Sequence, residues 1–195
     1  ILLPLWLTRD RVNLTGVGPL FAFFISIGLG FMLIETSQMQ RLIIALGHPT
    51  YGLSVVLFAV LLSSGIGSFL TRNVTIETAP ALGRRRMLAA VVVLAVFGFL
   101  TPPIVRWIEP MTTLARIAGA VALLFPAGLV MGMAFPLGLK LAAGRASELT
   151  AWLWGLNGAA SVMASVLSVC IALTWSISTA FWAGWLCYVA AFMAF

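Results

Sequence analysis

Charged residues divide this chain into long uncharged segments, and the lengths of these segments restrict the fold more than any other feature. Arg11 and Glu35 enclose 23 uncharged residues, comparable runs follow, and the last 47 residues carry no charge. A membrane-spanning helix needs about 20 apolar residues. The chain has 62% hydrophobic and only 8% charged residues, against roughly 25% charged residues in soluble domains. These values predict an integral membrane protein and exclude a typical soluble enzyme.

The uncharged segments account for six spans. Only helices or closed barrels satisfy every backbone group in lipid, and the short alternating segments of a barrel do not occur in this sequence. The last 47 residues are long enough for two helices, with a turn at the polar residues 174–178. We therefore predict an all-α, polytopic bundle of six transmembrane helices. The predicted spans are residues 17–35, 52–70, 87–105, 117–139, 149–173 and 179–195.

Prolines predict that the third and fourth helices are kinked. Pro102 and Pro103 lie in the third span, and Pro126 and Pro136 lie in the fourth. A proline inside a helix removes one backbone hydrogen bond and its ring clashes with the preceding turn. Broken helices are a feature of transporters, but prolines are also common in membrane helices generally.

The start of the chain predicts a fragment of a further helix. Residues 1–7 are apolar but too few to cross a bilayer, and the sequence does not begin with Met. We expect residues 1–7 to be the end of a helix whose beginning is missing. Residues 8–195 are then expected to form one six-span bundle.

Basic residues predict the orientation of the bundle. Eight of the eleven Lys and Arg residues fall on the N-terminal side of the spans and three on the opposite side. Cytoplasmic loops carry the excess of positive charge, so residues 8–16, 71–86, 140–148 and the C-terminus are predicted to be cytoplasmic. The strongest topology anchor is the run Arg84, Arg85 and Arg86. Membrane topology explains the net charge of +6 better than nucleic-acid binding does.

A candidate polar site interrupts the first span. Glu35, Gln38 and Arg41 follow one another at the end of an otherwise apolar run, and Asn157 lies within the fifth span. The first span either ends near Glu35 and is followed by a short interfacial helix, or it continues and places these side chains inside the protein. Charges at the bilayer centre are costly, so the group is either a capping pair at the membrane face or a site for a polar substrate or a proton.

A loop motif follows this polar run. Gly47, His48 and Pro49 are expected to end the helix, because glycine and proline terminate helices and the residue before proline is extended. His48 is the only histidine, and a loop role is favoured over proton chemistry or cofactor ligation. The sequence contains no metal-ligand cluster and no plausible Ser-His-Asp set, so we predict no metal, no cofactor and no catalytic residues.

Small residues predict close helix packing. They recur at helical spacing on several spans, and small faces let helices approach one another in lipid. The candidates for helix packing are Gly65, Gly67, Gly128, Gly132, Gly158, Ser161 and Ser165.

Two blocks of sequence, 28–51 and 152–162, carry a family resemblance. The first contains Gly-Leu-Gly-Phe-Met-Leu-Ile-Glu and Leu-Gly-His-Pro-Thr-Tyr, and the second is Trp-Leu-Trp-Gly-Leu-Asn-Gly-Ala-Ala-Ser-Val. With Ser-Ser-Gly-Ile-Gly-Ser at 63–68 and Met-Gly-Met-Ala-Phe-Pro-Leu-Gly at 131–138, they resemble the C-terminal membrane region of bacterial spermidine synthase-like multi-pass membrane proteins, which are remotely major-facilitator-like. This resemblance implies a bacterial inner membrane location. The aminopropyltransferase-like domain of that family is absent from these residues, so its activity is not transferred.

Two functions remain open at this point. In the favoured one, the chain is a non-catalytic, accessory or structural membrane module. It then contacts the lipid bilayer and packs against other membrane subunits or the missing remainder of its own chain. In the other, it is half of a transporter-like bundle that moves a small polar or cationic solute through a site near Glu35 and Asn157. The second hypothesis requires Glu35, Gln38 and Asn157 to meet at one water-accessible cavity.

Overall fold

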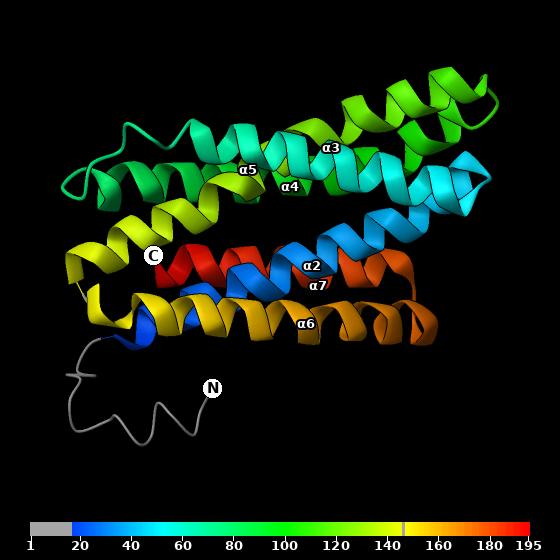
Figure 1. The fold of residues 1–195 in the computed structure, drawn as a ribbon. Helices are drawn as coiled ribbons and strands as arrows, with labels where there is room; N and C mark the ends of the chain where they lie inside the picture. The colour runs from blue at the N-terminus through cyan, green and yellow to red at the C-terminus, as the bar shows by residue number, and fades with distance from the viewer. Residues whose placement is uncertain (1–16, 146) are drawn as a thin grey trace.

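The computed structural model describes residues 17–145 and 147–195, and this part of the chain is a bundle of six long helices (Figure 1). The segments 1–7 and 8–16, for which we predicted the end of a helix and a cytoplasmic stretch, lie outside the described residues. Each of the six helices is long and apolar enough to cross a membrane. The predicted all-α membrane fold is confirmed. The helices are α2 (Gly18–Leu46), α3 (Pro49–Phe69), α4 (Ala79–Ile108), α5 (Thr113–Arg145), α6 (Thr150–Thr174) and α7 (Ile177–Ala194), with a short 3-10 helix η2 (Ser147–Leu149) before α6.

Successive helices alternate in direction. The α2–α3, α4–α5 and α6–α7 connections lie at one end of the bundle, and the α3–α4 and α5–α6 connections lie at the other, together with the C-terminus (Figure 1). We call these the α2–α3 end and the α3–α4 end. This alternation is the one that six consecutive spans require.

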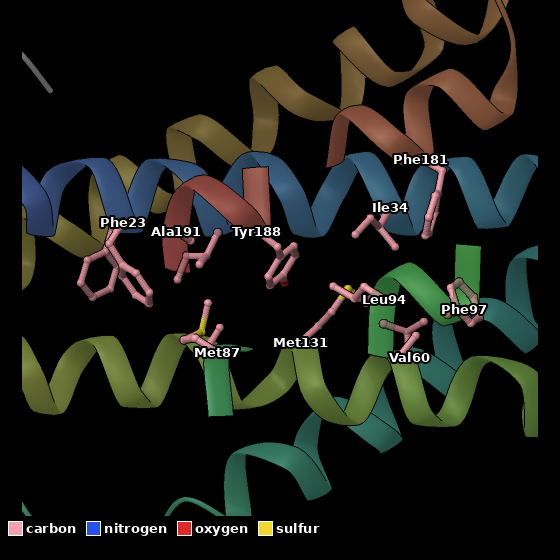
Figure 2. Close-up of a cluster of buried hydrophobic side chains, with 14 of the residues drawn as sticks. Phe23, Ile34, Val60, Met87, Leu94, Phe97, Met131, Phe181, Tyr188 and Ala191 are labelled. Atoms are coloured by element: carbon pink, nitrogen blue, oxygen red, sulfur yellow. The ribbon is translucent and has the colours of Figure 1, made fainter. Parts of the chain in front are cut away.

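Helix α2 is the central element. It contacts all five other helices of the described chain, and 61% of its most apolar stretch is buried, against 17% for α6. Its most extensive contacts are with α6 and α7 on one side, whereas α3 and α4 both pack on α5. Figure 2 shows the core between these two groups, where Ile34, Met131 and Tyr188 meet from α2, α5 and α7.

The first helix continues through the polar run. Helix α2 extends from Gly18 to Leu46 without a break, so the alternative of a separate interfacial helix after Glu35 is wrong. The helix ends where the loop motif predicted. Gly47 has a φ of +72°, the only positive φ in the described chain, and its N–H donates to the carbonyl oxygens of Ile43 and Ile44. Glycine is the residue that adopts this conformation without a Cβ penalty.

Helices α2, α4 and α5 are longer than the uncharged segments that predicted them. Helix α4 begins at Ala79, so Arg84, Arg85 and Arg86 lie in its second turn and not in the preceding loop. Helix α5 likewise includes Lys140. Long basic side chains place their charges in the polar interface while their stems cover apolar surface. A positive charge therefore marks the edge of the hydrocarbon layer but not the end of a helix.

The four prolines of the third and fourth helices are accommodated within them. Pro102 and Pro103 lie inside α4, and Pro126 and Pro136 lie inside α5. Thr101, directly before the first pair, donates its hydroxyl proton to the carbonyl oxygen of Phe97 at 2.7 Å. The carbonyl groups that the two prolines leave without a helical N–H are those of Gly98 and Phe99, so the Thr101 bond satisfies the buried hydroxyl of Thr101 and does not replace a bond that the prolines remove.

Candidate functional site

Glu35 and Gln38 lie together inside the bundle. Both belong to α2, three residues apart and therefore on one face of the helix, and their side chains are 8% and 1% exposed. They line a small cavity of about 10 Å³ that α3, α4 and α5 also border. Eleven residues follow Glu35 before α2 ends, or about 17 Å of helix at 1.5 Å per residue. Glu35 therefore lies well inside helix α2, several turns before its C-terminal end.

Neither side chain has a polar partner in the described chain. Both polar atoms of the Gln38 amide are buried without a hydrogen bond, and no hydrogen bond or ion pair joins Glu35 to another described residue. Buried polar groups are nearly always hydrogen-bonded. Glu35 and Gln38 are thus unusual in the part of the chain that the structure describes.

Arg41 does not join this pair. Its Nη2 donates to the hydroxyl oxygen of Ser178 at 2.8 Å, on the exposed surface where α7 begins. Arg116 fixes the same end, since its Nη1 donates to the carbonyl oxygen of Ala45 at 3.2 Å. These two arginines connect α2 to α7 and to α5 at the α2–α3 end.

Asn157 packs α6 against α2. Its Nδ2 donates to the carbonyl oxygen of Phe24 at 2.9 Å, which is the contact across helices that a mid-span asparagine predicts. Ser161, one turn further, has its hydroxyl 2.9 Å from the carbonyl oxygen of Asn157 and 3.4 Å from that of Gly28. A Cβ on Gly28 would lie 2.6 Å from the Asn157 backbone oxygen, so the glycine is needed for this close approach.

A groove of about 300 Å³ lies beside Asn157, between α5 and α6 and over α2. Its polar lining includes Asn157, Ser161 and Tyr188. Beyond the bond from Asn157 Nδ2, the Asn157 amide and the Tyr188 hydroxyl have no hydrogen bond with the described residues. Phe135 and Trp154 bridge α5 and α6 beside it, with ring centroids 4.7 Å apart. We call this the α5–α6 groove.

The predicted polar site is therefore divided. Glu35 and Gln38 share the small cavity, Asn157 lines the α5–α6 groove, and the two spaces have a single lining residue in common, Met131 of α5. The sequence did not single out Met131 or Tyr188. Both lie in uncharged apolar segments, where neither hydropathy nor spacing distinguishes them from other core residues.

The small residues divide into two groups. Gly67, Gly128 and Gly132 lie at the α3–α5 interface, where an added Cβ would overlap Leu129, Ser63 and Ser64 respectively. Gly65 and Gly158 instead face open space, with nothing within 4 Å of an added Cβ, and Ser165 bonds to the carbonyl oxygen of Val162 in its own helix. Helix packing within the described chain does not account for Gly65 and Gly158.

The loop motif and the basic run occupy the two ends of the bundle. His48 is exposed and extended (φ −144°, ψ 125°), makes no cap hydrogen bond and places its ring 5.3 Å from that of Tyr51. At the other end, Arg86 donates to the carbonyl oxygen of Leu70 at 3.1 Å, and Arg84 lies over the ring of Phe192.

Lys140 holds the α3–α4 connection in place. Its Nζ donates to the carbonyl oxygens of Thr71, Arg72 and Val74 at 2.5, 3.1 and 2.5 Å. These three carbonyl groups belong to the turn that follows the end of α3 at Phe69. Lys140 of α5 therefore fixes the connection between α3 and α4.

Neither a metal-ligand cluster nor a similar protein indicates a function for this site. The described residues contain no group of three or more His, Cys, Asp or Glu that could hold a metal ion. Comparison of the chain with protein-family models, curated proteins and solved structures finds no match in any of the three. The resemblance to spermidine synthase-like membrane proteins stays a prediction.

Proposed function

We propose that this chain is a non-catalytic membrane module that packs through the α5–α6 groove against a transmembrane helix of another subunit or of a longer chain. The observation that carries this proposal is the polar lining of a groove on the side of an apolar bundle. Asn157 and Tyr188 retain hydrogen-bonding groups without partners there. Such groups are unfavourable against lipid hydrocarbon, and a polar side chain of a neighbouring helix would satisfy them.

The surface beside the groove supports the same proposal. Gly158 and Ser165 lie two helical turns apart on the face of α6 that continues from Ser161. Gly158 is exposed, with open space around it. Small residues at such positions let a second helix approach closely in the membrane. The groove and this small face together would accommodate one helix.

The test is co-purification from native membranes with a matched pair of variants. Gly158→Trp adds bulk to the proposed contact surface, and Met163→Trp adds bulk to an exposed position on another side of α6. We expect a stoichiometric partner to be recovered with the native chain and with the Met163 variant, but to be lost with the Gly158 variant. Recovery of no stoichiometric partner, or equal recovery with both variants, would contradict the proposal.

A pathway for a polar solute has less support. The transporter hypothesis requires Glu35, Gln38 and Asn157 at one cavity, whereas Asn157 lines a separate groove. The cavity at Glu35 and Gln38, about 10 Å³, has room for no more than about one water molecule. A solute larger than water would need the helices to move apart.

A further inference from the structure

The cavity beside Gln38 is suited to a very small polar occupant. A volume of about 10 Å³ is near the lower limit for holding a water molecule, which also needs two to four polar partners. The Gln38 amide supplies a donor and an acceptor with no other hydrogen bond in the described chain. The Glu35 carboxyl group supplies the other polar atoms on the same wall.

The surroundings of Glu35 disfavour a permanent negative charge. The cavity-lining residues from α3, α4 and α5 are Val60, Phe97, Leu124, Ala127, Gly128 and Met131, and none of them ionises. From α7, the titratable side chain of Tyr188 is buried in the same core and lines the α5–α6 groove. Arg41, on the same helix, donates instead to Ser178. An unpaired carboxylate costs far more to bury than a neutral acid that can hydrogen-bond.

Met131 lies between Glu35 and the nearest larger space. This side chain is 3% exposed and lines both the small cavity and the α5–α6 groove. Figure 2 shows it extending from α5 toward Ile34 and Tyr188. Methionine is unbranched and flexible, so it fills irregular gaps and can change rotamer at little cost. The groove, at about 300 Å³, has room for several water molecules of about 30 Å³ each.

We propose that Glu35 and Gln38 form a buried proton-binding site that exchanges protons with water in the α5–α6 groove past the side chain of Met131. The proton is transferred from a hydronium ion in the groove to a carboxylate oxygen of Glu35, and one water molecule joins the resulting acid to the Gln38 amide. On release the proton returns to water. The Gln38 Nε2 is the donor that the small cavity offers to the carboxylate that remains. The proton-binding site itself does not depend on the proposed partner, because Glu35 and Gln38 line a cavity separate from the groove. A partner helix that filled the groove would close the route for proton exchange and leave the site in place.

Infrared spectroscopy of the full chain in phosphatidylcholine vesicles tests the proton site. A protonated carboxylic acid has a C=O stretching band that a carboxylate lacks. At neutral pH we expect this band in the native protein, its loss in Glu35→Gln, and its retention when the exposed Glu77, Glu109 and Glu148 are all changed to Gln. Absence of the band from the native protein, or its persistence in Glu35→Gln, would overturn the proposal.

A second variant keeps the test valid if Glu35→Gln does not fold. Gln38→Leu leaves the acid in place but removes its hydrogen-bonding neighbour, so the band should move to higher frequency without disappearing. An unchanged frequency in this variant would mean that Gln38 does not share the site with Glu35.

Hydrogen–deuterium exchange of the same band tests the role of Met131. Met131→Ala should exchange several-fold faster than the native protein, and Met131→Leu should remain close to native. Leu124→Ala is the matched control, because Leu124 is 1% exposed and lines the small cavity but not the groove. Equal acceleration in the Met131→Ala and Leu124→Ala variants would indicate general loosening of the core and would contradict the proposed route.

Discussion

The amide nitrogen of Asn157 donates a 2.9 Å hydrogen bond to the backbone carbonyl oxygen of Phe24, and this bond joins the outermost helix of the bundle to its central one. The contact lies in a region where α6 presents Asn157 and Ser161 to Gly28. Helix association in membranes depends on close packing and interhelical hydrogen bonds, because lipid supplies no hydrophobic driving force between helices. Asn157 thus has two roles: its amide nitrogen packs α6 against α2, and its side chain also lines the α5–α6 groove.

Asn157→Ala should therefore weaken the α2–α6 contact. Interhelical hydrogen bonds in membranes contribute about 0.6 kcal/mol on average and up to about 1.7 kcal/mol. We expect a loss of about 1 kcal/mol, measured as the free energy of unfolding in mixed micelles. Ser165→Ala is the control, because that hydroxyl bonds to the carbonyl oxygen of Val162 in its own helix. Equal losses in the two variants would show that the Asn157 bond has no special weight.

Alanine at Gly132 should destabilise the bundle, whereas alanine at Gly65 should not. A Cβ at Gly132 would overlap the backbone of Ser64, while a Cβ at Gly65 meets nothing. Overpacking costs about 1–3 kcal/mol, and glycine to alanine in an open helical position gains up to about 1 kcal/mol. Thermal unfolding of the two variants, followed by circular dichroism, should shift in opposite directions. A lower melting temperature for both variants would argue against the close α3–α5 approach.

Lys140→Met should release the α3–α4 connection. The variant keeps the length of the side chain but loses three hydrogen bonds to backbone carbonyls. A hydrogen bond to a charged group contributes about 1.5–3 kcal/mol, so we expect a loss of that order and faster amide exchange at residues 70–78. Arg85→Met, at an exposed position of α4, serves as the control. Unchanged exchange in the Lys140 variant would show that Lys140 does not hold this connection.

Cysteine accessibility should reveal the orientation that basic residues predict. Cys170 and Cys187 are first replaced by Ala, and one cysteine is then introduced in each of two variants, Thr75→Cys and Thr112→Cys. The two positions are exposed and lie at opposite ends of the bundle. A membrane-impermeant maleimide applied to intact spheroplasts should label the Thr112 position and should label the Thr75 position only after permeabilisation. The reverse pattern would show that the α3–α4 end is not cytoplasmic.

Much of the fold follows from counting residues between charges. Six spans, their alternation and the termination at Gly47 are all local properties, since they depend on segment length and on the conformations that glycine and proline allow. The first and last residues of the helices were predicted less accurately than their number. Lys140 and the run of Arg84, Arg85 and Arg86 lie within helices, because long basic side chains reach the interface from inside a helix.

The candidate site was predicted less completely than the fold. Glu35 and Gln38 were identified because polar residues are conspicuous in an apolar segment, and their spacing places them on one helical face. The same prediction grouped Arg41 and Asn157 with them, but Arg41 bonds to Ser178 and Asn157 lines the α5–α6 groove. Separating these residues requires knowing which helices are neighbours. Met131 entered only as part of the block 131–138, and Tyr188 was not singled out. Their positions matter because Met131 lines both spaces and Tyr188 lines the groove, and these spaces exist only once the helices have packed.

The sequence by itself determined that this chain crosses a membrane as helices, how many times it does so, and where charge enters an apolar span. These outcomes depend on the free energy of placing each segment in lipid, which is a sum over neighbouring residues. Only the tertiary structure decided that α2 is the central helix, that Glu35 is enclosed with Gln38, and that Met131 separates them from the α5–α6 groove. Such relationships depend on which surfaces of distant helices fit together. Gly28 and Gly132 permit this fit because a Cβ at either position would overlap the neighbouring helix.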